Sequence, residues 1–156
     1  MATSNFTITL PVSKTPREVF DAINNIRGWW TEDFEGNSQK LNDEFTVRFF
    51  EDIHVSTQKL IEVVPDKKIV WLVTKSKLNF LQDPNEWTGT KISFEITGNE
   101  NKSDSHQTQI HFNHLGLVPG IECYKDCSKG WNYYIKESLF KSLTEGKGKP
   151  EAKSSK

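Results

Sequence analysis

The hydrophobic residues of this chain change their spacing once, and that change limits the folds it can form. From Glu44 to Leu115 they recur at every second position in short runs, the period of a strand with one buried face. After Pro119-Gly120 they recur at every third or fourth position over about six turns, the period of an amphipathic helix. The sequence therefore predicts a series of strands followed by one long C-terminal helix.

Five period-two runs make up the predicted sheet after the N-terminal region. They are Glu44 to Phe49, Val55 to Val64, Lys68 to Thr74, Thr90 to Thr97 and Gln107 to Leu115. Pro65-Asp66 and the polar segment from Asn99 to Ser105 have the composition of turns. Short connections between successive strands predict an antiparallel meander with one apolar face. Arg48 lies on the opposite side from its apolar neighbours, so we expect it to be solvated.

A further strand and two short helices are predicted before these runs. Alternation from Asn5 to Val12 predicts a strand that stops at Pro11. Thr15 and Glu18 flank Pro16 as a capping box, which predicts the start of a helix. Its buried side would contain Val19, Phe20, Ala22, Ile23 and Ile26. The pattern breaks at Gly28, which leaves Trp29 and Trp30 in or just after a short second helix.

The C-terminal helix has an apolar side along its whole predicted length. That side contains Ile121, Tyr124, Cys127, Trp131, Tyr134 or Ile135, Leu139 and Leu143. Gly130 costs roughly 1 kcal/mol inside a helix relative to Ala, so we expect a packing contact or a bend there. Gly146 is placed to end the helix. Residues 1–146 would form one domain, and residues 147–156, which lack apolar periodicity, a disordered tail.

This order of elements predicts the α+β class. A curved antiparallel sheet would lay its apolar face on the long C-terminal helix, with two short helices after the first strand. Eighteen aromatic residues (ten Phe, five Trp and three Tyr) supply a large core and argue against a disordered chain.

Charge and composition exclude several classes of partner. The chain has 20 basic and 21 acidic residues, and residues 1–146 have a net charge of −4 because the tail holds four Lys and one Glu. We therefore expect no nucleic-acid partner. No apolar run is long enough to span a membrane. The N-terminus resembles no secretory signal and the two cysteines provide no disulfide framework, so we expect a cytoplasmic protein.

Several local strings, in this order, resemble the START-like (SRPBCC) superfamily, which has the helix-grip fold of the birch pollen allergen. Within it the chain looks most like the family homologous to the C-terminal domain of the heat-shock-protein-90 ATPase activator. The resemblance covers roughly Phe6 to Leu143. The strings are Thr15-Pro16-Arg17-Glu18-Val19-Phe20, Trp29-Trp30, Ile69-Val70-Trp71, Glu86-Trp87-Thr88-Gly89-Thr90 and Gly130-Trp131.

The resemblance implies a cavity between the sheet and the long helix. Large aromatic residues with few polar groups around them would suit an apolar or aromatic ligand. The alternative is that these rings fill a solid core. The candidate ligand-binding aromatic residues are Trp29, Trp30, Phe49, Trp71, Phe80, Trp87, Trp131 and Tyr134.

His114 is the one ionisable residue that the strand pattern turns inward. It shares its parity with Ile110 and Phe112, so it would either contact a ligand or be a hydrogen-bonded core histidine. Cys123 and Cys127 are one helical turn apart, but no nearby pair of Cys or His completes a zinc site. We expect no metal and no cofactor. No nucleophile elbow or phosphate-binding loop is present, and no carboxylate pair converges.

These observations favour a domain that binds a small hydrophobic or aromatic molecule. The resemblance also implies an alternative, a protein-interaction module that regulates a chaperone. An enzyme of the cyclase or dehydratase kind is a third hypothesis, which would depend on His114. More weight falls on binding than on catalysis.

Overall fold

Seven strands in the described part of the chain form one antiparallel sheet. The computed structural model describes residues 5–49, 54–78, 82, 85–98, 108–118 and 124–150. The strands lie in the order β1-β7-β6-β5-β4-β3-β2, and each is antiparallel to its neighbour. They are β1 (Phe6–Val12), β2 (Phe34–Gly36), β3 (Glu44–Phe49), β4 (His54–Val64), β5 (Lys68–Leu78), β6 (Lys91–Gly98) and β7 (Thr108–Leu115).

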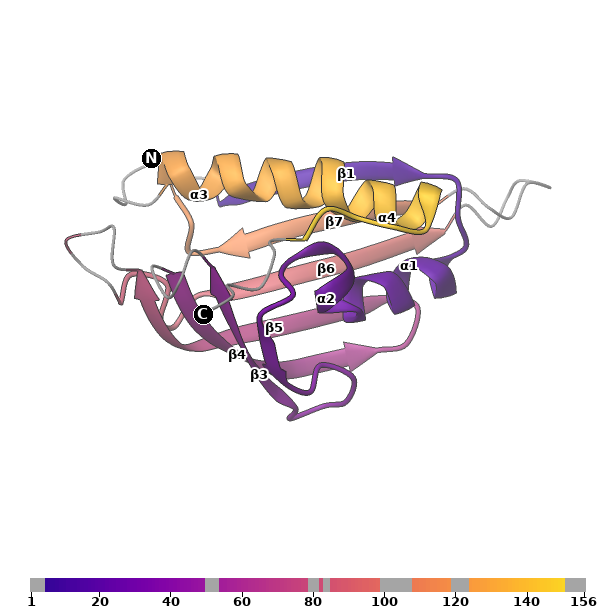
Figure 1. The fold of residues 1–156 in the computed structure, drawn as a ribbon. Coiled ribbons are helices and arrows are strands. Elements are labelled where there is room, and N and C mark those ends of the chain that lie inside the picture. Colours follow the sequence, from indigo (N-terminus) through magenta and orange to yellow (C-terminus); the bar gives the residue numbers. More distant parts are fainter. Residues whose placement is uncertain are drawn as a thin grey trace.

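The helices lie against one face of this curved sheet (Figure 1). The two short ones are α1 (Pro16–Asn24) and α2 (Ile26–Trp29). The C-terminal helix spans 22 residues as three consecutive segments, α3 (Tyr124–Trp131), a π-helical segment η1 (Asn132–Leu139) and α4 (Phe140–Glu145). The predicted α+β helix-grip architecture is confirmed. No helix in the described residues is long and apolar enough to span a membrane.

The residues predicted to begin the first helix and to end the last helix do so in the structure. The Thr15 hydroxyl accepts a hydrogen bond from the Glu18 N–H at 3.1 Å, and the Glu18 carboxylate accepts one from the Thr15 N–H at 3.0 Å. Gly146 ends α4 with a φ of 80°, a left-handed conformation that glycine adopts without strain. Beyond it, the Lys149 N–H donates to the Ser138 hydroxyl at 2.7 Å. The division into a domain and a disordered tail stays a prediction, and residues 151–156 lie outside the described residues.

The C-terminal helix differs from its prediction in the middle. A π segment has wider turns than an α-helix, so the set of residues that faces the sheet changes along it. Ser138 is therefore fully buried next to Leu139, although the apolar pattern did not include it. Of the two alternatives expected at Gly130, the packing contact is absent, because a Cβ atom added there would meet nothing within 4 Å. The other alternative, a bend, stays a prediction, and the π segment begins two residues later at Asn132.

Three strand features also differ from the sequence prediction. The strand β2 was not predicted, since three residues are too few to show a period. Pro11 does not end β1; it pairs with Gln109 inside the strand, which an edge strand tolerates because one side of its backbone is unpaired. Arg48 is not simply solvated, since its guanidinium forms an ion pair with the Glu35 carboxylate.

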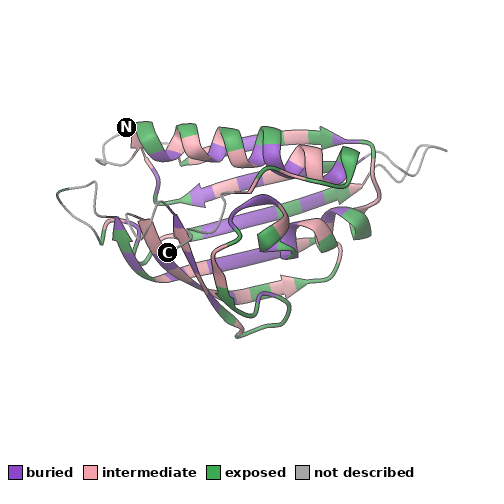
Figure 2. Cartoon of the chain, viewed as in Figure 1, coloured by how far each residue is buried: buried purple, intermediate pink, exposed green. Residues whose placement is uncertain are grey.

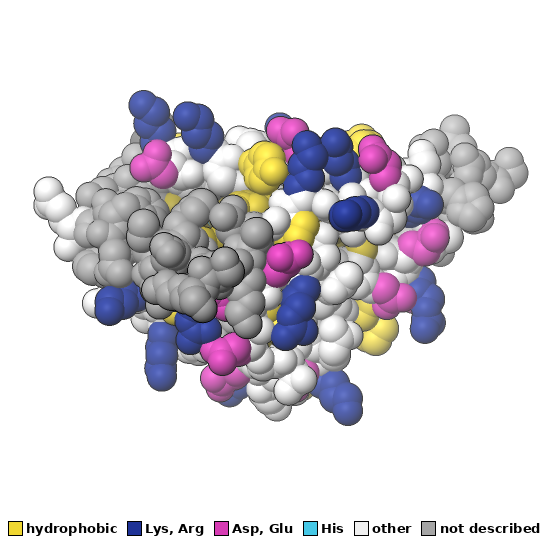
Figure 3. Space-filling model, viewed as in Figure 1, with side chains coloured by type: hydrophobic (Ala, Val, Ile, Leu, Met, Phe, Trp, Pro, Cys, Tyr) yellow, Lys and Arg dark blue, Asp and Glu magenta, His cyan; other side chains and the backbone are white. Residues whose placement is uncertain are grey.

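The core fills the space between the sheet and the helices. Figure 2 shows buried residues on the inner faces of the strands and on the side of the long helix that faces them. The apolar residues predicted to point inward from β3, β6 and β7 are all buried. On the outer surface, basic and acidic side chains are interspersed over the described part of the face shown in Figure 3, with hydrophobic side chains in small separate areas.

Candidate functional site

Four indoles from four separate segments stack into a column inside the core. Trp30, at the end of α2, lies between Trp71 of β5 and Trp131 of the long helix, with centroid distances of 5.7 and 5.1 Å. Trp131 in turn stacks on Trp87 at 5.9 Å with an interplanar angle of 9°. Stacked aromatic pairs contribute about 0.5–1.5 kcal/mol each beyond their burial. The column therefore joins the sheet, α2 and the long helix.

The remaining predicted aromatic residues lie beside Trp30 in the middle of this column. Trp29 stacks on Trp30 at 5.9 Å. Phe49 contacts Trp30 at 5.6 Å and Tyr134 at 5.7 Å. Thus seven of the eight predicted aromatic residues form one contiguous cluster, and Phe80 lies outside the described residues. Whether the cluster binds a ligand stays a prediction.

Trp87 reaches the core from a turn rather than from a strand. The turn Asn85–Gly89 comes before β6, and the Gly89 N–H donates to the Val73 carbonyl of β5 at 2.8 Å. Gly89 has a φ of 91°, which disfavours any residue with a side chain. These contacts hold the turn against the sheet and place the indole, which is 3% exposed, over Trp131.

His114 lies beside Trp87 with both ring nitrogens hydrogen-bonded. The Trp131 indole N–H donates to His114 Nδ1 at 3.0 Å. An indole nitrogen can only donate, so Nδ1 carries no hydrogen and the neutral ring is protonated at Nε2. Nε2 then donates to the Thr90 hydroxyl at 2.9 Å, which donates to the Trp87 carbonyl at 2.6 Å. His114 thus ties the long helix to the turn that holds Trp87.

A second histidine, His54, which is half-buried with its Nε2 atom inaccessible, was missed by sequence reasoning. It begins β4, and its ring makes edge contacts with Trp87 and with Phe49, both at 4.8 Å. Trp87 therefore contacts two imidazoles, since His114 also lies 4.8 Å away. No signal in the sequence pointed to His54, because it shares its parity with the polar residues Ser56 and Gln58, whose burial only the structure shows.

Burial keeps both histidines neutral. Desolvation lowers the pKa of His54 from 6.5 to about 3. Desolvation, with a smaller contribution from nearby His54, lowers the pKa of His114 to about 3 as well. A base this weak accepts few protons near pH 7, and both nitrogens of His114 are already engaged. The geometry therefore suits a positioning role for His114 better than general-base catalysis.

Several polar atoms in this interior have no hydrogen-bond partner among the residues that the structure describes. They are buried, with less than 1 Å² accessible each, and they belong to residues that face the aromatic cluster or the strands beneath it. Native proteins satisfy about nine in ten such groups, and each unsatisfied one costs about 1–3 kcal/mol. The atoms are His54 Nε2, Trp87 Nε1, Trp71 Nε1 and Gln58 Oε1.

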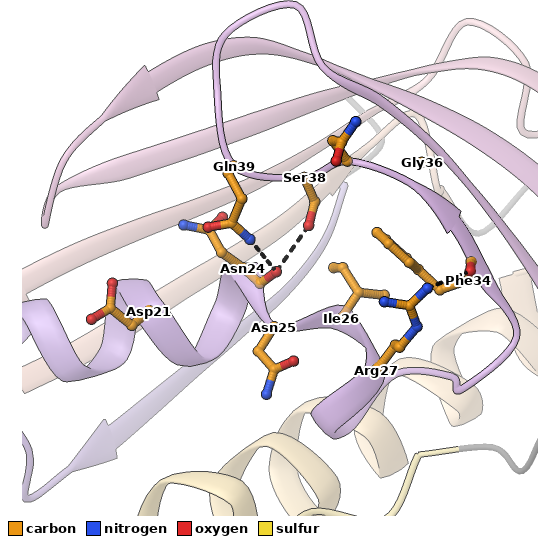
Figure 4. A pocket seen from close by; sticks show the side chains of 10 residues that line it. Asp21, Asn24, Asn25, Ile26, Arg27, Phe34, Gly36, Ser38 and Gln39 are labelled. Atoms are coloured by element: carbon orange, nitrogen blue, oxygen red, sulfur yellow. Dashed lines mark hydrogen bonds between the residues drawn. The ribbon is translucent and has the colours of Figure 1, made fainter.

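A separate pocket of about 390 Å³ lies on the surface between α1, α2 and the segment after β2 (Figure 4). Its lining is mostly polar. The Arg27 guanidinium lies 4.6 Å above the Phe34 ring and donates to the Phe34 carbonyl at 3.0 Å. Ser38 and Gln39 both donate to the Asn24 carbonyl. These contacts join the end of α1 to the loop, and none of the residues predicted to bind a ligand lines this pocket.

The described residues provide few groups for metal binding or thiol chemistry. No group of three or more His, Cys, Asp or Glu in the described part of the chain could hold a metal ion. Cys127 is buried on the inner side of α3, whereas Cys123 lies outside the described residues.

Comparison with known proteins identifies the fold. No protein-family model and no curated protein matches this sequence. Among solved structures, the Aha1 dimer from Colwellia psychrerythraea superposes with a TM-score of 0.72 at 24% identity, over 93% of this chain and 99% of that one. An HSP90 activator from Plasmodium falciparum, PFC0360w, has a TM-score of 0.58 at 17% identity, over 94% and 98% of the two chains.

A third similar structure comes from a different context. DynU16, a putative protein in the dynemicin biosynthetic locus, has a TM-score of 0.65 at 14% identity over 94% of this chain and 50% of its own. All three identities are below the level at which function can be transferred with the fold. The resemblance drawn from the sequence is nevertheless confirmed at the level of the fold: the chain has the helix-grip architecture of these solved structures.

Proposed function

We propose that this protein binds a small hydrophobic or aromatic molecule in the interior between the sheet and the long helix, around Trp87. The observation that carries the proposal is the pair of unpartnered polar atoms, His54 Nε2 and Trp87 Nε1, on two rings that contact each other. A core built only for stability would gain by pairing these atoms or by replacing the rings with apolar side chains. A bound molecule that hydrogen-bonds them would recover that free energy.

Access to this site requires a ring to move. Less than 1 Å² of each unpartnered atom is accessible, so no water-sized space adjoins them. Trp87 is the suitable mobile element, because it lies on the turn Asn85–Gly89, whereas Trp71 lies within the strand β5, which pairs with strands on both sides. A ligand would displace the Trp87 ring partly and take its place against Trp131.

Thermal unfolding in the presence of a compound panel tests this function. Fatty acids, sterols and flavonoids should be titrated while the unfolding temperature is followed. A compound at 100 times its Kd adds about 2.7 kcal/mol to the free energy of unfolding, which corresponds to roughly 5–10 °C for a chain of this size. Trp87→Leu should remove the shift, whereas Lys136→Ala, on the exposed side of the helix, should keep it. If no compound of the panel raises the unfolding temperature, the proposal is wrong.

A second candidate function is regulation of a chaperone. It is supported by two of the similar structures, an Aha1 dimer and an HSP90 activator. The described surface offers no continuous apolar patch for it, because the exposed large hydrophobic residues lie on different elements. They are Leu41, Val64, Leu115 and Tyr133.

Chaperone ATPase measurements distinguish the two candidates. A regulator at saturating concentration should change the ATP turnover of a heat-shock-protein-90 chaperone and co-elute with it. Unchanged turnover without co-elution would exclude this function and leave ligand binding in place. A cytoplasmic location stays a prediction under both candidates.

A further inference from the structure

The described residues in the interior around Trp87 carry no formal charge near pH 7. None of the Asp, Glu, Lys or Arg residues that the structure describes is buried. His114 is buried and His54 half-buried, and both are neutral near pH 7, because desolvation lowers the pKa of each to about 3. A buried carboxylate needs a cation or several hydrogen-bond donors to offset its desolvation. This interior offers no such cation.

The unpartnered atoms define what a ligand must carry. Trp87 Nε1 is a donor without an acceptor, and Gln58 Oε1 is an acceptor without a donor. His54 Nε2 accepts in one neutral tautomer and donates in the other. An oxygen that both accepts and donates, such as a phenolic hydroxyl, can bond an indole N–H and an imidazole nitrogen at the same time.

We propose, on the basis of the function proposed above, that the site selects neutral aromatic molecules that carry a hydroxyl group and rejects carboxylates, fatty acids included. The aromatic part replaces ring contacts around Trp131, and the hydroxyl oxygen accepts from Trp87 Nε1 while its hydrogen is donated to His54. Specificity follows from two terms: the hydrogen bonds favour a phenol over a bare hydrocarbon, and desolvation without a counter-charge disfavours a carboxylate.

Three isosteric probes test the selectivity. Dissociation constants of 2-naphthol, naphthalene and 2-naphthoate should be measured at pH 7 by calorimetry or by titration of backbone NMR signals. We expect 2-naphthol to bind about tenfold more tightly than naphthalene. We expect 2-naphthoate to bind at least 100-fold more weakly than 2-naphthol.

Two matched variants assign the selectivity to Trp87. Trp87→Phe keeps an aromatic ring but removes the indole N–H, so the preference for 2-naphthol over naphthalene should fall, and only the part due to the bond with His54 should remain. Trp29→Phe makes the same change at the other end of the cluster and should leave the preference as in the wild type. Equal preference in the wild type and Trp87→Phe would overturn the assigned hydrogen bond.

The outcomes separate this inference from the function on which it rests. If 2-naphthoate binds as tightly as 2-naphthol or more tightly, the inferred selectivity is wrong and ligand binding stands. If naphthalene binds as well as 2-naphthol, the hydroxyl requirement is wrong. If none of the three probes binds and the compound panel also produces no thermal shift, the proposed function itself fails.

Discussion

Two indoles buried in the same core, Trp29 and Trp87, differ in what their N–H groups contact. Trp29 Nε1 donates to the Ile23 carbonyl at 3.1 Å, and the Trp29 carbonyl accepts from the Ser138 hydroxyl at 2.6 Å. Trp87 Nε1 has no partner, and neither does the adjacent His54 Nε2. Both rings are buried and both stack on another Trp.

The difference separates a region in which the indole N–H is paired from the proposed binding region. Around Trp29, hydrogen bonds join α1, α2 and the long helix, and the unpartnered atom nearby, Asn24 Oδ1, lies at the end of α1. Around Trp87, the His114 hydrogen bonds position the turn and leave two polar atoms that the fold does not use. Natural proteins retain such unsatisfied groups mostly where function needs them.

Trp131 lies between the two regions, and its removal should disrupt both. Trp131→Ala takes away contacts to Trp30 and Trp87 as well as the donor to His114, and leaves a large cavity. A buried Trp cut to Ala costs about 3–5 kcal/mol. We expect a much lower urea midpoint or failure to fold. Lys136→Ala, which is exposed, should change little; equally small losses in both variants would show that the helix face is assigned wrongly.

Mild acid should weaken the Trp87 region selectively. In the unfolded chain each imidazole takes up a proton near pH 6.5, whereas in the folded protein His54 and His114 stay neutral down to about pH 3 because burial lowers their pKa. The unfolded state binds more protons between these limits, so the free energy of unfolding falls as pH falls. From pH 7 to 5 we expect a loss of about 2 kcal/mol for each histidine.

Urea unfolding at pH 7 and pH 5 measures this loss. His54→Asn should remove about half of the pH dependence, because one of the two buried imidazoles is gone. Stability that is independent of pH over this interval would contradict the buried neutral state of both histidines.

Matched substitutions of the two indoles sharpen the comparison. Trp29→Phe removes a ring and a hydrogen-bond donor, whereas Trp87→Phe removes a ring whose donor is unused. A typical hydrogen bond contributes about 1 kcal/mol. Trp29→Phe should therefore destabilise by about 1 kcal/mol more than Trp87→Phe in urea unfolding. A larger loss for Trp87→Phe would mean that its N–H is satisfied in the ligand-free protein.

Gly130→Ala should stabilise the helix that spans both regions. The added methyl group meets no atom within 4 Å, and alanine is favoured over glycine in a helix by about 1 kcal/mol. We expect a gain of about 0.5–1 kcal/mol in the same measurement. Destabilisation would show that the π segment just beyond needs the freedom of this glycine.

Features of the fold that depend on neighbouring residues could be predicted from the sequence. The capping box of Thr15 and Glu18 and the inward side of β6 are set by residues a few positions apart. The three-residue strand β2 could not be predicted, because it forms only by pairing with β3. The π segment likewise follows from packing of the helix on α2 and the sheet, which no local pattern encodes.

The candidate site likewise has some features that follow from the local sequence and others that depend on contacts between distant segments. Inward positions on strands, such as His114 and Trp71, follow from alternation. The unpaired state of Trp87 Nε1 could not be predicted, because it depends on where the turn Asn85–Gly89 docks and on which atoms it leaves unpaired. The His114 network was also beyond reach, since it joins β7, the long helix and the turn.

The ¹⁵N NMR signals of the Trp indole N–H groups, recorded while 2-naphthol is added, test the central claim most directly. Trp29 and Trp87 would be assigned from the Trp29→Phe and Trp87→Phe variants. A hydrogen bond moves an indole proton signal downfield, so the account predicts a saturable downfield shift of the Trp87 signal with the Trp29 signal almost unmoved. No saturable shift of Trp87, or an equal shift of Trp29, would contradict the claim that the Trp87 region is the binding site.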